Sequence, residues 1–191
     1  MTIAVLAVQG AFAEHENVLE RLGIPYVELR KKEDLFIKYD GLILPGGEST
    51  VQGKLLKELG MFDTIKEQIQ DGMPVLATCA GMILLADKVE NDHREYFKTL
   101  PVTVKRNAYG RQLGSFYTEQ EFKGIGVIPM TFIRAPYIDS VENGVDILSK
   151  ENGHIVAVRY NNQLALSFHP ELDNDHRIHE YFSHMVQSHM R

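Results

Sequence analysis

A single cysteine occupies the kind of sequence that forms a nucleophile elbow. Cys79 lies within residues 74–82, where a short apolar run ends in small residues and then resumes as a helical pattern. On a sharp turn from strand to helix, a cysteine projects its sulfur away from the backbone, and the first amides of the helix favour the thiolate. We therefore predict that Cys79 is a nucleophile.

A base and a carboxylate for such a thiol stand far downstream. His169 and Glu171 are two positions apart, so an extended backbone would put both side chains on one face. Pro170 disfavours the helical region for the residue before it and so predicts an extended segment. In this interpretation His169 is the general base and Glu171 is the carboxylate that orients its imidazole.

Each of these signals has a simpler structural explanation. A lone cysteine is most often a small buried hydrophobic residue, and the His-Pro-Glu segment could be an ordinary strand exit with a solvated carboxylate. The catalytic interpretation depends on the combination, because each piece supplies a different part of one acyl-transfer site.

A glycine-rich turn supplies a third part of such a site. Residues 45–50, Pro-Gly-Gly-Glu-Ser-Thr, directly follow an apolar run. Glycines allow a backbone to turn its amides outward, toward an anion or the oxyanion of acyl transfer. A phosphate loop fails on spacing, because Gly53-Lys54 is followed by leucine where that motif needs Ser or Thr. A purely structural turn remains the alternative.

Composition limits the class of protein. The chain has 191 residues, of which 44% are hydrophobic and 24% are charged, with a net charge of −6. These values are typical of a soluble globular domain, so we expect one domain over residues 1–191. The acidic balance argues against a nucleic-acid or anionic-membrane partner. One cysteine excludes an internal disulfide, and the N-terminal apolar run lacks the basic flank of a signal peptide, so we expect a cytoplasmic location.

Short apolar runs alternate with helical patterns in the first half of the chain, which favours βαβ units and a largely parallel sheet. The second half has strand-like runs with Gly, Pro and Asn turns, consistent with antiparallel additions. The predicted strands are residues 3–8, 26–29, 42–44, 74–77, 102–105, 113–117, 126–133, 155–159 and 163–168, and the predicted helices are residues 14–22, a pair within 51–71 interrupted at Gly60, and 175–187. The turns that follow 42–44, 74–77 and 163–168 would lie at the carboxyl ends of strands, where open α/β sheets collect their sites.

Six short motifs spread over nearly the whole chain match a known pattern. They occupy residues 8–12, 45–50, 78–81, 106–112, 132–136 and 167–172. With them, the chain resembles the glutaminase subunits of bacterial-type pyridoxal 5'-phosphate synthases. The cysteine elbow and the His-x-Glu pair alone indicate the wider class I glutamine amidotransferases. Val-Gln-Gly-Ala, Arg-Asn-x-x-Gly-Arg-Gln and Phe-Ile-Arg-Ala-Pro are specific to this family. The sequence departs from the pattern at Ala77, where the wider class usually has glycine, and in residues 91–97.

The resemblance implies a three-layer class I glutamine amidotransferase-like α/β fold and hydrolysis of L-glutamine to glutamate and ammonia. Cys79 would attack the side-chain amide, and His169 would protonate the departing ammonia and then activate water. The resemblance also implies where glutamine binds. The residues that match the family's glutamine site are Gly47, Glu48, Ser49, the side chain of Arg106, and the backbone at Ile133 and Arg134.

Two of these assignments have their own chemical reasons. The guanidinium of Arg106 could hold the α-carboxylate of glutamine by a two-pronged hydrogen bond, with a surface salt bridge as the alternative. The backbone amides of Gly47 and Ala80 are the candidates for the oxyanion hole.

The resemblance also implies a partner. In the family, ammonia passes to a separate synthase subunit that makes pyridoxal phosphate, so this compound is a product of the complex and we expect no cofactor in this chain. We predict that the synthase subunit contacts Gln9 and Gly10 and biases the backbone at Gly46 and Gly47 toward the oxyanion-binding arrangement.

Three alternatives stand beside this interpretation. The first is a subunit of another class I amidotransferase, such as that of imidazole glycerol phosphate synthesis, and the second is a catalytically silent docking subunit. The third is a metal site in the histidine-rich C-terminal segment. His176 and His179 have a usable spacing on a helix, but no closely spaced third ligand follows, so we expect no metal.

Overall fold

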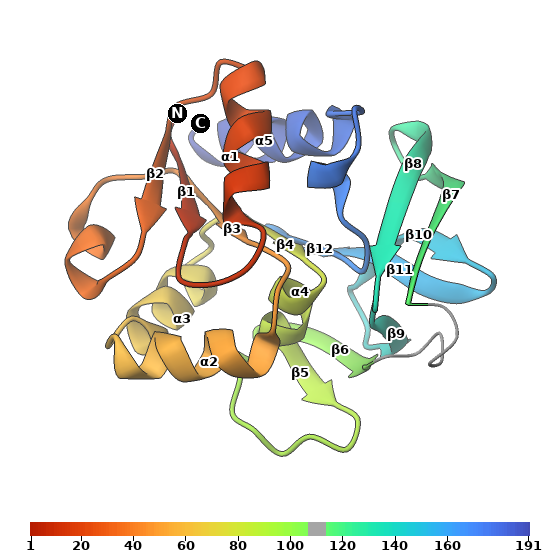
Figure 1. Cartoon of the computed structure of the whole chain (residues 1–191), viewed down its shortest axis with the longest axis horizontal. Helices are drawn as coiled ribbons and strands as arrows, with labels where there is room; N and C mark the ends of the chain where they lie inside the picture. Colours follow the sequence, from red (N-terminus) through yellow and green to blue (C-terminus); the bar gives the residue numbers. More distant parts are fainter. Residues whose placement is uncertain (107–113) are drawn as a thin grey trace.

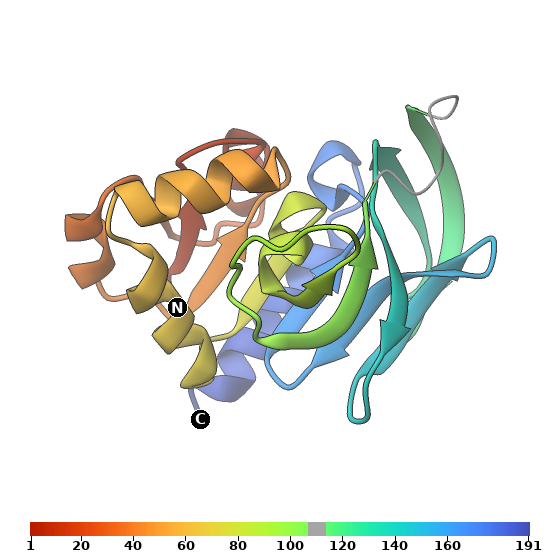
Figure 2. The same cartoon turned by 90° about the horizontal axis from the view of Figure 1, so that it is seen from below.

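The computed structural model describes residues 1–106 and 114–191. The predicted strand start at Leu113 and residues 107–112 of the 106–112 motif lie outside the described residues. In the described part of the chain, ten strands form one sheet, with helices on both of its faces (Figure 1, Figure 2). A separate two-stranded hairpin stands beside the sheet.

The order of the strands in the large sheet differs from their order in the sequence. Across the sheet they are β2 (Tyr26–Leu29), β1 (Ile3–Leu6), β3 (Gly41–Leu44), β4 (Val75–Thr78), β12 (Gln163–Leu166), β11 (His154–Tyr160), β9 (Tyr137–Val141), β6 (Leu100–Lys105) and β5 (Ala86–Val89), with β10 (Asp146–Glu151) paired to β11. The hairpin consists of β7 (Ser115–Phe122) and β8 (Gly126–Ile133). The helices are α1 (Phe12–Arg21), α2 (Ser49–Glu58), α3 (Phe62–Gln70), α4 (Ala80–Leu85) and α5 (Arg177–His189), with short 3-10 turns η1 (Lys32–Phe36) and η2 (Pro170–Leu172).

Strand direction divides the sheet into two parts. The run β2-β1-β3-β4-β12 is parallel throughout. Beyond it, β11 is antiparallel to β12, β9 and β10, and β9 is antiparallel to β6. At the far edge, β5 and β6 are parallel. The prediction of a mostly parallel sheet with antiparallel additions is confirmed.

The central strands are buried on both faces, which makes the fold three-layered. In β1, Ile3 and Val5 pack into the core beneath α1 and α5, whereas Ala4 and Leu6 pack into the core beneath α2, α3 and α4. This alternation follows from the two-residue period of a strand, and it explains why such strands read as continuous apolar runs. Figure 1 shows the two helical layers on opposite sides of the sheet.

Most predicted elements of the first half are confirmed to within a few residues. The helical pair occurs as α2 and α3 with Gly60 between them. The strand at 126–133 is confirmed as β8. The prediction missed β5, β9 and β10, because each carries charged residues at exposed positions and lacks a clear apolar run.

Candidate active site

Turns from four parallel strands meet at one edge of the sheet. β1, β3, β4 and β12 run in the same direction, so their carboxyl ends lie side by side. The backbone N–H of Cys79 donates to Leu166 O at 2.8 Å, which fixes the turn after β4 next to the turn after β12. The structure thereby brings Cys79 and His169 together from distant parts of the chain, as open α/β sheets do at such edges.

Cys79 lies on a sharp turn between β4 and α4. Its φ of 48° and ψ of −101° are unusual for a residue with a Cβ, and such conformations cluster at functional sites. The turn is held by close packing at Gly81, where a Cβ would lie 2.1 Å from Leu44 O. Ala77, where the wider class has glycine, is fully buried in β4 and leaves the elbow intact.

His169 and Glu171 form a buried pair. His169 Nδ1 lies 2.7 Å from Glu171 Oε1, and both side chains are at most 8% exposed. The expectation of an extended segment was wrong, because Pro170 starts the 3-10 turn η2 instead. Proline is tolerated at a first helical position, where its missing N–H costs no bond. The turn still brings the two side chains into contact.

Electrostatics favour a protonated His169. Burial alone would lower the pKa of this imidazole, but its hydrogen bonds with Cys79 and Glu171 raise the pKa of His169 to about 10. Burial alone would raise the pKa of Glu171, but His15 and the hydrogen bond from His169 outweigh it and hold the pKa of this carboxyl below its usual range. The resting pair is an imidazolium and a carboxylate, so His169 can give a proton before it accepts one.

The glycine-rich turn packs directly against this histidine. A Cβ on Gly46 would lie 2.3 Å from His169 Cε1, so no larger residue fits without displacing the imidazole. Gly10, with φ of 103°, approaches the same turn so closely that its Cβ would lie 1.9 Å from Gly46 O. The structure therefore interlocks the turn after β1 with the turn after β3.

Two glutamines bond these turns together. Gln9 Oε1 accepts the backbone N–H of Glu48 at 2.9 Å. The buried Gln52 donates from Nε2 to Gln9 O at 3.0 Å and to Pro45 O at 3.1 Å. A change in the position of Gln9 would consequently be transmitted to the backbone beside Gly47, which is exposed at the edge of the site.

The side chain of Arg106 contacts residues to which the sequence analysis assigned no role. Its Nη2 lies 2.8 Å from Asp92 Oδ2 and also bonds the hydroxyl of Tyr96. Tyr96 in turn interacts with the side chain of Ser49, so Arg106 borders the glycine-rich turn. The ion pair is not a surface one, because the Asp92 side chain is 5% exposed. Residues 91–97 thus supply the surroundings of Arg106.

Ile133 and Arg134 stand at the end of β8, close to the same edge. Two residues earlier, Thr131 O accepts the backbone N–H of His169 at 2.8 Å. Arg134 has a φ of 42°, a conformation that costs energy for a residue with a Cβ, and its N–H donates to Gly114 O. This strained end of the hairpin directs the backbone at Ile133 and Arg134 away from the regular strand.

Two histidines behind the carboxylate were missed as site residues. His15 Nε2 lies 3.5 Å from Glu171 Oε2, and His15 Nδ1 lies 3.0 Å from His179 Nε2. The sequence does indicate that His15 is buried, because it precedes Val18 by three positions and Leu19 by four and so lies on the apolar face of a predicted helix. No pattern in the sequence indicated that α1 and α5 bring their histidines together.

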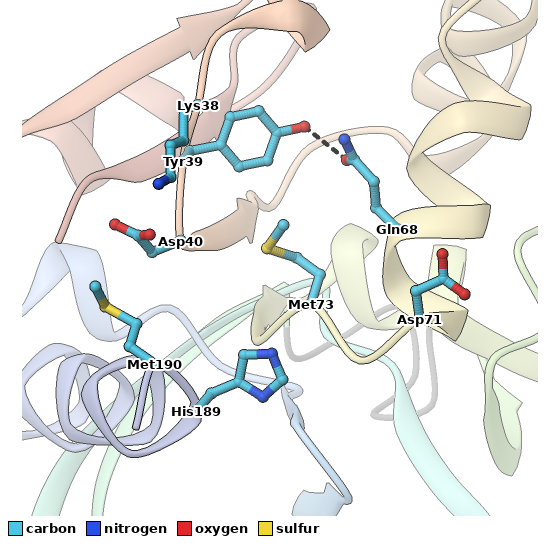
Figure 3. A pocket seen from close by; sticks show the side chains of 8 residues that line it. All are labelled: Lys38, Tyr39, Asp40, Gln68, Asp71, Met73, His189 and Met190. Atoms are coloured by element: carbon cyan, nitrogen blue, oxygen red, sulfur yellow. Dashed lines mark hydrogen bonds between the residues drawn. The ribbon is translucent and has the colours of Figure 1, made fainter.

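A cavity away from Cys79 is lined by none of the predicted site residues. It measures about 470 Å³, and two of its lining residues, Asp40 and Met73, come just before β3 and β4 in the chain. Figure 3 shows the side chains that line it. Its lining residues are Lys38, Tyr39, Asp40, Gln68, Asp71, Met73, His189 and Met190. Tyr39 and Gln68 are hydrogen-bonded to each other at 2.6 Å, and His189 contacts Asn162.

Within residues 1–106 and 114–191, no three His, Cys, Asp or Glu side chains are grouped as metal ligands. His179, which was paired with His176 in the metal-site alternative, instead contacts His15. Among the described helices, none combines the length and the apolar character that a membrane span requires.

A cysteine on a strand-to-helix elbow, a buried His–Glu pair and an adjoining glycine-rich turn form the arrangement expected of a cysteine-dependent acyl-transfer site. The chain belongs to the SNO glutamine amidotransferase family, whose model matches residues 5–188.

Curated relatives agree with this assignment. The chain is 64% identical over 182 residues to "Pyridoxal 5'-phosphate synthase subunit PdxT" of Desulfitobacterium hafniense (strain Y51), covering 95% of this chain and 92% of the relative. It is 54% identical over 190 residues to the protein of the same name in Streptococcus pneumoniae (strain ATCC 700669 / Spain 23F-1), covering 98% of each.

Solved structures agree as well. A crystal structure of a glutamine amidotransferase has a TM-score of 0.92 and 42% identity, covering 97% of this chain and 98% of its own. A putative GMP synthase subunit of Thermoplasma acidophilum, 18% identical, shares the fold with a TM-score of 0.72, covering 100% of this chain and 96% of its own. The predicted fold class is confirmed.

Proposed function

We propose that this chain is the glutaminase subunit of a pyridoxal 5'-phosphate synthase. It hydrolyses L-glutamine to glutamate and ammonia and delivers the ammonia to a synthase subunit. The observation that carries the proposal is the contact of His169 with both Cys79 and Glu171 at the carboxyl edge of the sheet. The names of the relatives supply the identity of the larger enzyme. Residues 1–191 act as one domain in this proposal, located in the cytoplasm and needing no cofactor.

The proposed chemistry begins with the sulfur of Cys79. As a thiolate, it attacks the side-chain carbonyl carbon of glutamine and forms the tetrahedral intermediate. The tetrahedral intermediate collapses to a thioester while His169 gives its proton to the departing ammonia. His169, now neutral, takes a proton from water, which attacks the thioester and releases glutamate. Glu171 keeps the imidazole in one orientation throughout.

The oxyanion of each intermediate needs two donors. We assign the backbone amides of Gly47 and Ala80 to this role, since one follows β3 and the other follows Cys79 at the same edge. Glu48 and Ser49 extend the glutamine site from the glycine-rich turn, and the backbone at Ile133 and Arg134 closes its other side.

An assay of glutamine hydrolysis with and without the synthase subunit tests the proposed function. We expect glutamate and ammonia in equal amounts, at a rate that rises when the synthase subunit is added. No hydrolysis under either condition would support the catalytically silent docking subunit instead. Stimulation only by the synthase of a different amidotransferase pathway would support the other alternative.

Arg106 yields a prediction about substrate capture. Arg106→Lys keeps the charge but loses the planar fork, so we expect the KM for glutamine to rise about 10-fold with a small change in kcat. Arg94→Lys is the matched control, because Arg94 pairs with the same Asp92 from a more exposed position. Steady-state kinetics of both variants would measure the effect, and an unchanged KM in Arg106→Ala would remove Arg106 from the site.

Gln9 yields a prediction about the partner. Its side chain holds the N–H of Glu48, so a synthase subunit that contacts Gln9 and Gly10 can shift the backbone at Gly46 and Gly47. Gln9→Ala should lower the ratio of stimulated to basal hydrolysis while alkylation of Cys79 stays nearly unchanged. Asn17→Ala, an exposed change on α1, is the control. Equal stimulation of wild type and Gln9→Ala at saturating partner, with equal partner affinity, would exclude the role of Gln9.

A further inference from the structure

A line of buried polar groups continues behind the triad. His15 on α1 and His179 on α5 are both 0% exposed, on the face of the sheet that these two helices cover (Figure 1). His15 Nδ1 lies 3.0 Å from His179 Nε2, and His15 Nε2 lies 3.5 Å from Glu171 Oε2. Burying an imidazole costs free energy unless its nitrogens are paired. The contacts of these two rings therefore need an explanation.

The contacts select one set of tautomers. In the 3.0 Å contact, one nitrogen must carry the proton and the other must accept it. If His15 carried it on Nδ1, its Nε2 lone pair would face the carboxylate of Glu171, and His179 would bury an N–H on Nδ1. That Nδ1 has no hydrogen-bond partner among the residues described. A buried donor without an acceptor is rarer than a buried acceptor without a donor. Both rings therefore carry the proton on Nε2.

This choice places a proton of His15 beside the second oxygen of the carboxylate. The Nε2–H of His15 is hydrogen-bonded to Thr78 Oγ1 at 3.3 Å, and Glu171 Oε2 lies 3.5 Å from the same nitrogen. Glu171 Oε2 is buried and accepts no hydrogen bond within the described ranges, so the approach of His15 Nε2 is an electrostatic contact with an otherwise unpaired oxygen. The other oxygen, Oε1, is the one that accepts from His169. The two histidines thus lie on opposite sides of one carboxylate.

Burial keeps the outer histidines uncharged. It lowers the pKa of His15 against the attraction of Glu171, and it lowers the pKa of His179 further below its usual value. A neutral imidazole can donate through one nitrogen while it accepts through the other, which suits His15 to its place between His179 and Glu171.

We propose that His15, itself oriented by His179, positions the carboxylate of Glu171 by holding its Nε2–H, bonded to Thr78, close to Oε2. This inference rests on the proposed role of Glu171 as the carboxylate of the triad. His15 is a positioning residue, since it acts on His169 only through Glu171. A polar N–H fixed beside one oxygen favours one rotamer of the carboxylate and aims Oε1 at His169, as the outer partners of metal-bound histidines orient those ligands.

Two matched substitutions separate positioning from packing. His15→Gln places an amide N–H where Nε2 stood, whereas His15→Asn is one methylene shorter and cannot reach Glu171. Both remove the ring and keep a neutral polar group. In the complex with the synthase subunit, we expect His15→Gln to retain kcat for glutamine within about threefold and His15→Asn to lower it about 10- to 100-fold, with KM unchanged in both. The same two changes at the exposed His184 are the control and should have no effect.

Equal kcat values for His15→Gln and His15→Asn, or an effect on KM alone, would overturn the proposal. A measurement on the wild-type chain covers the case in which the variants do not fold. Nitrogen-15 NMR of labelled histidines should find His15 and His179 neutral with the proton on Nε2. A charged His15, or one with its proton on Nδ1, would also overturn it. Failure of the proposed function has a different signature, because the wild-type complex itself would then not hydrolyse glutamine.

Discussion

Cys79→Ala should reduce glutamine hydrolysis by at least about 10⁴-fold, both with and without the synthase subunit. The substitution removes the only sulfur nucleophile at the elbow, and no other cysteine exists in the chain to replace it. The activity is measured as glutamate release from purified protein at saturating glutamine. Substantial residual activity in the pure variant would end the proposed mechanism.

The same variant should keep its fold and its partner affinity. Alanine has the same Cβ at the strained φ of 48°, so the turn gains no new conflict, and little buried volume is lost. We expect a stability change of about 1 kcal/mol. The controls are thermal unfolding and binding to the synthase subunit, since a loss of either would leave the activity change open to a structural cause.

The second large effect concerns the base and the carboxylate. His169→Asn should be comparably damaging to Cys79→Ala, because it removes the group that gives and takes the proton. Glu171→Gln should cost about 10- to 100-fold less, because the imidazole remains while its orientation and its charge support are lost. The three variants are compared by kcat under identical conditions with the synthase subunit present.

The order of these losses is the informative result. If Glu171→Gln were worse than both other variants, the roles assigned to His169 and Glu171 would be wrong. If His169→Asn kept most of the activity, another group would have to protonate the departing ammonia.

The part of the fold that positions the site could be predicted from the sequence. The strands β1, β3 and β4 are buried on both faces, so they appear as continuous apolar runs, and each ends in residues typical of a turn. The elbow at Cys79 and the turn at 45–50 followed from these ends. The strands β5, β9 and β10 could not be found in this way, because charged residues at their exposed positions interrupt any apolar run.

The remaining site features depend on contacts between distant segments. Pro170 led to the prediction of an extended segment, which was wrong, because the contact between His169 and Glu171 is made across a 3-10 turn and not along a strand. The pairing of Arg106 with Asp92 requires the 91–97 segment to fold back beside β6. The contact of His15 with His179 joins helices at opposite ends of the chain, and no local pattern encodes it.

A glutamine analogue with a diazoketone in place of the side-chain amide gives the most direct test of Cys79 as the nucleophile. In the complex with the synthase subunit, we predict one covalent label per chain, located on Cys79 by peptide mass spectrometry, with loss of hydrolysis in proportion to labelling and protection by glutamine. Loss of activity with the label on another residue, or full hydrolysis by a chain whose Cys79 is completely labelled, would contradict the proposed mechanism.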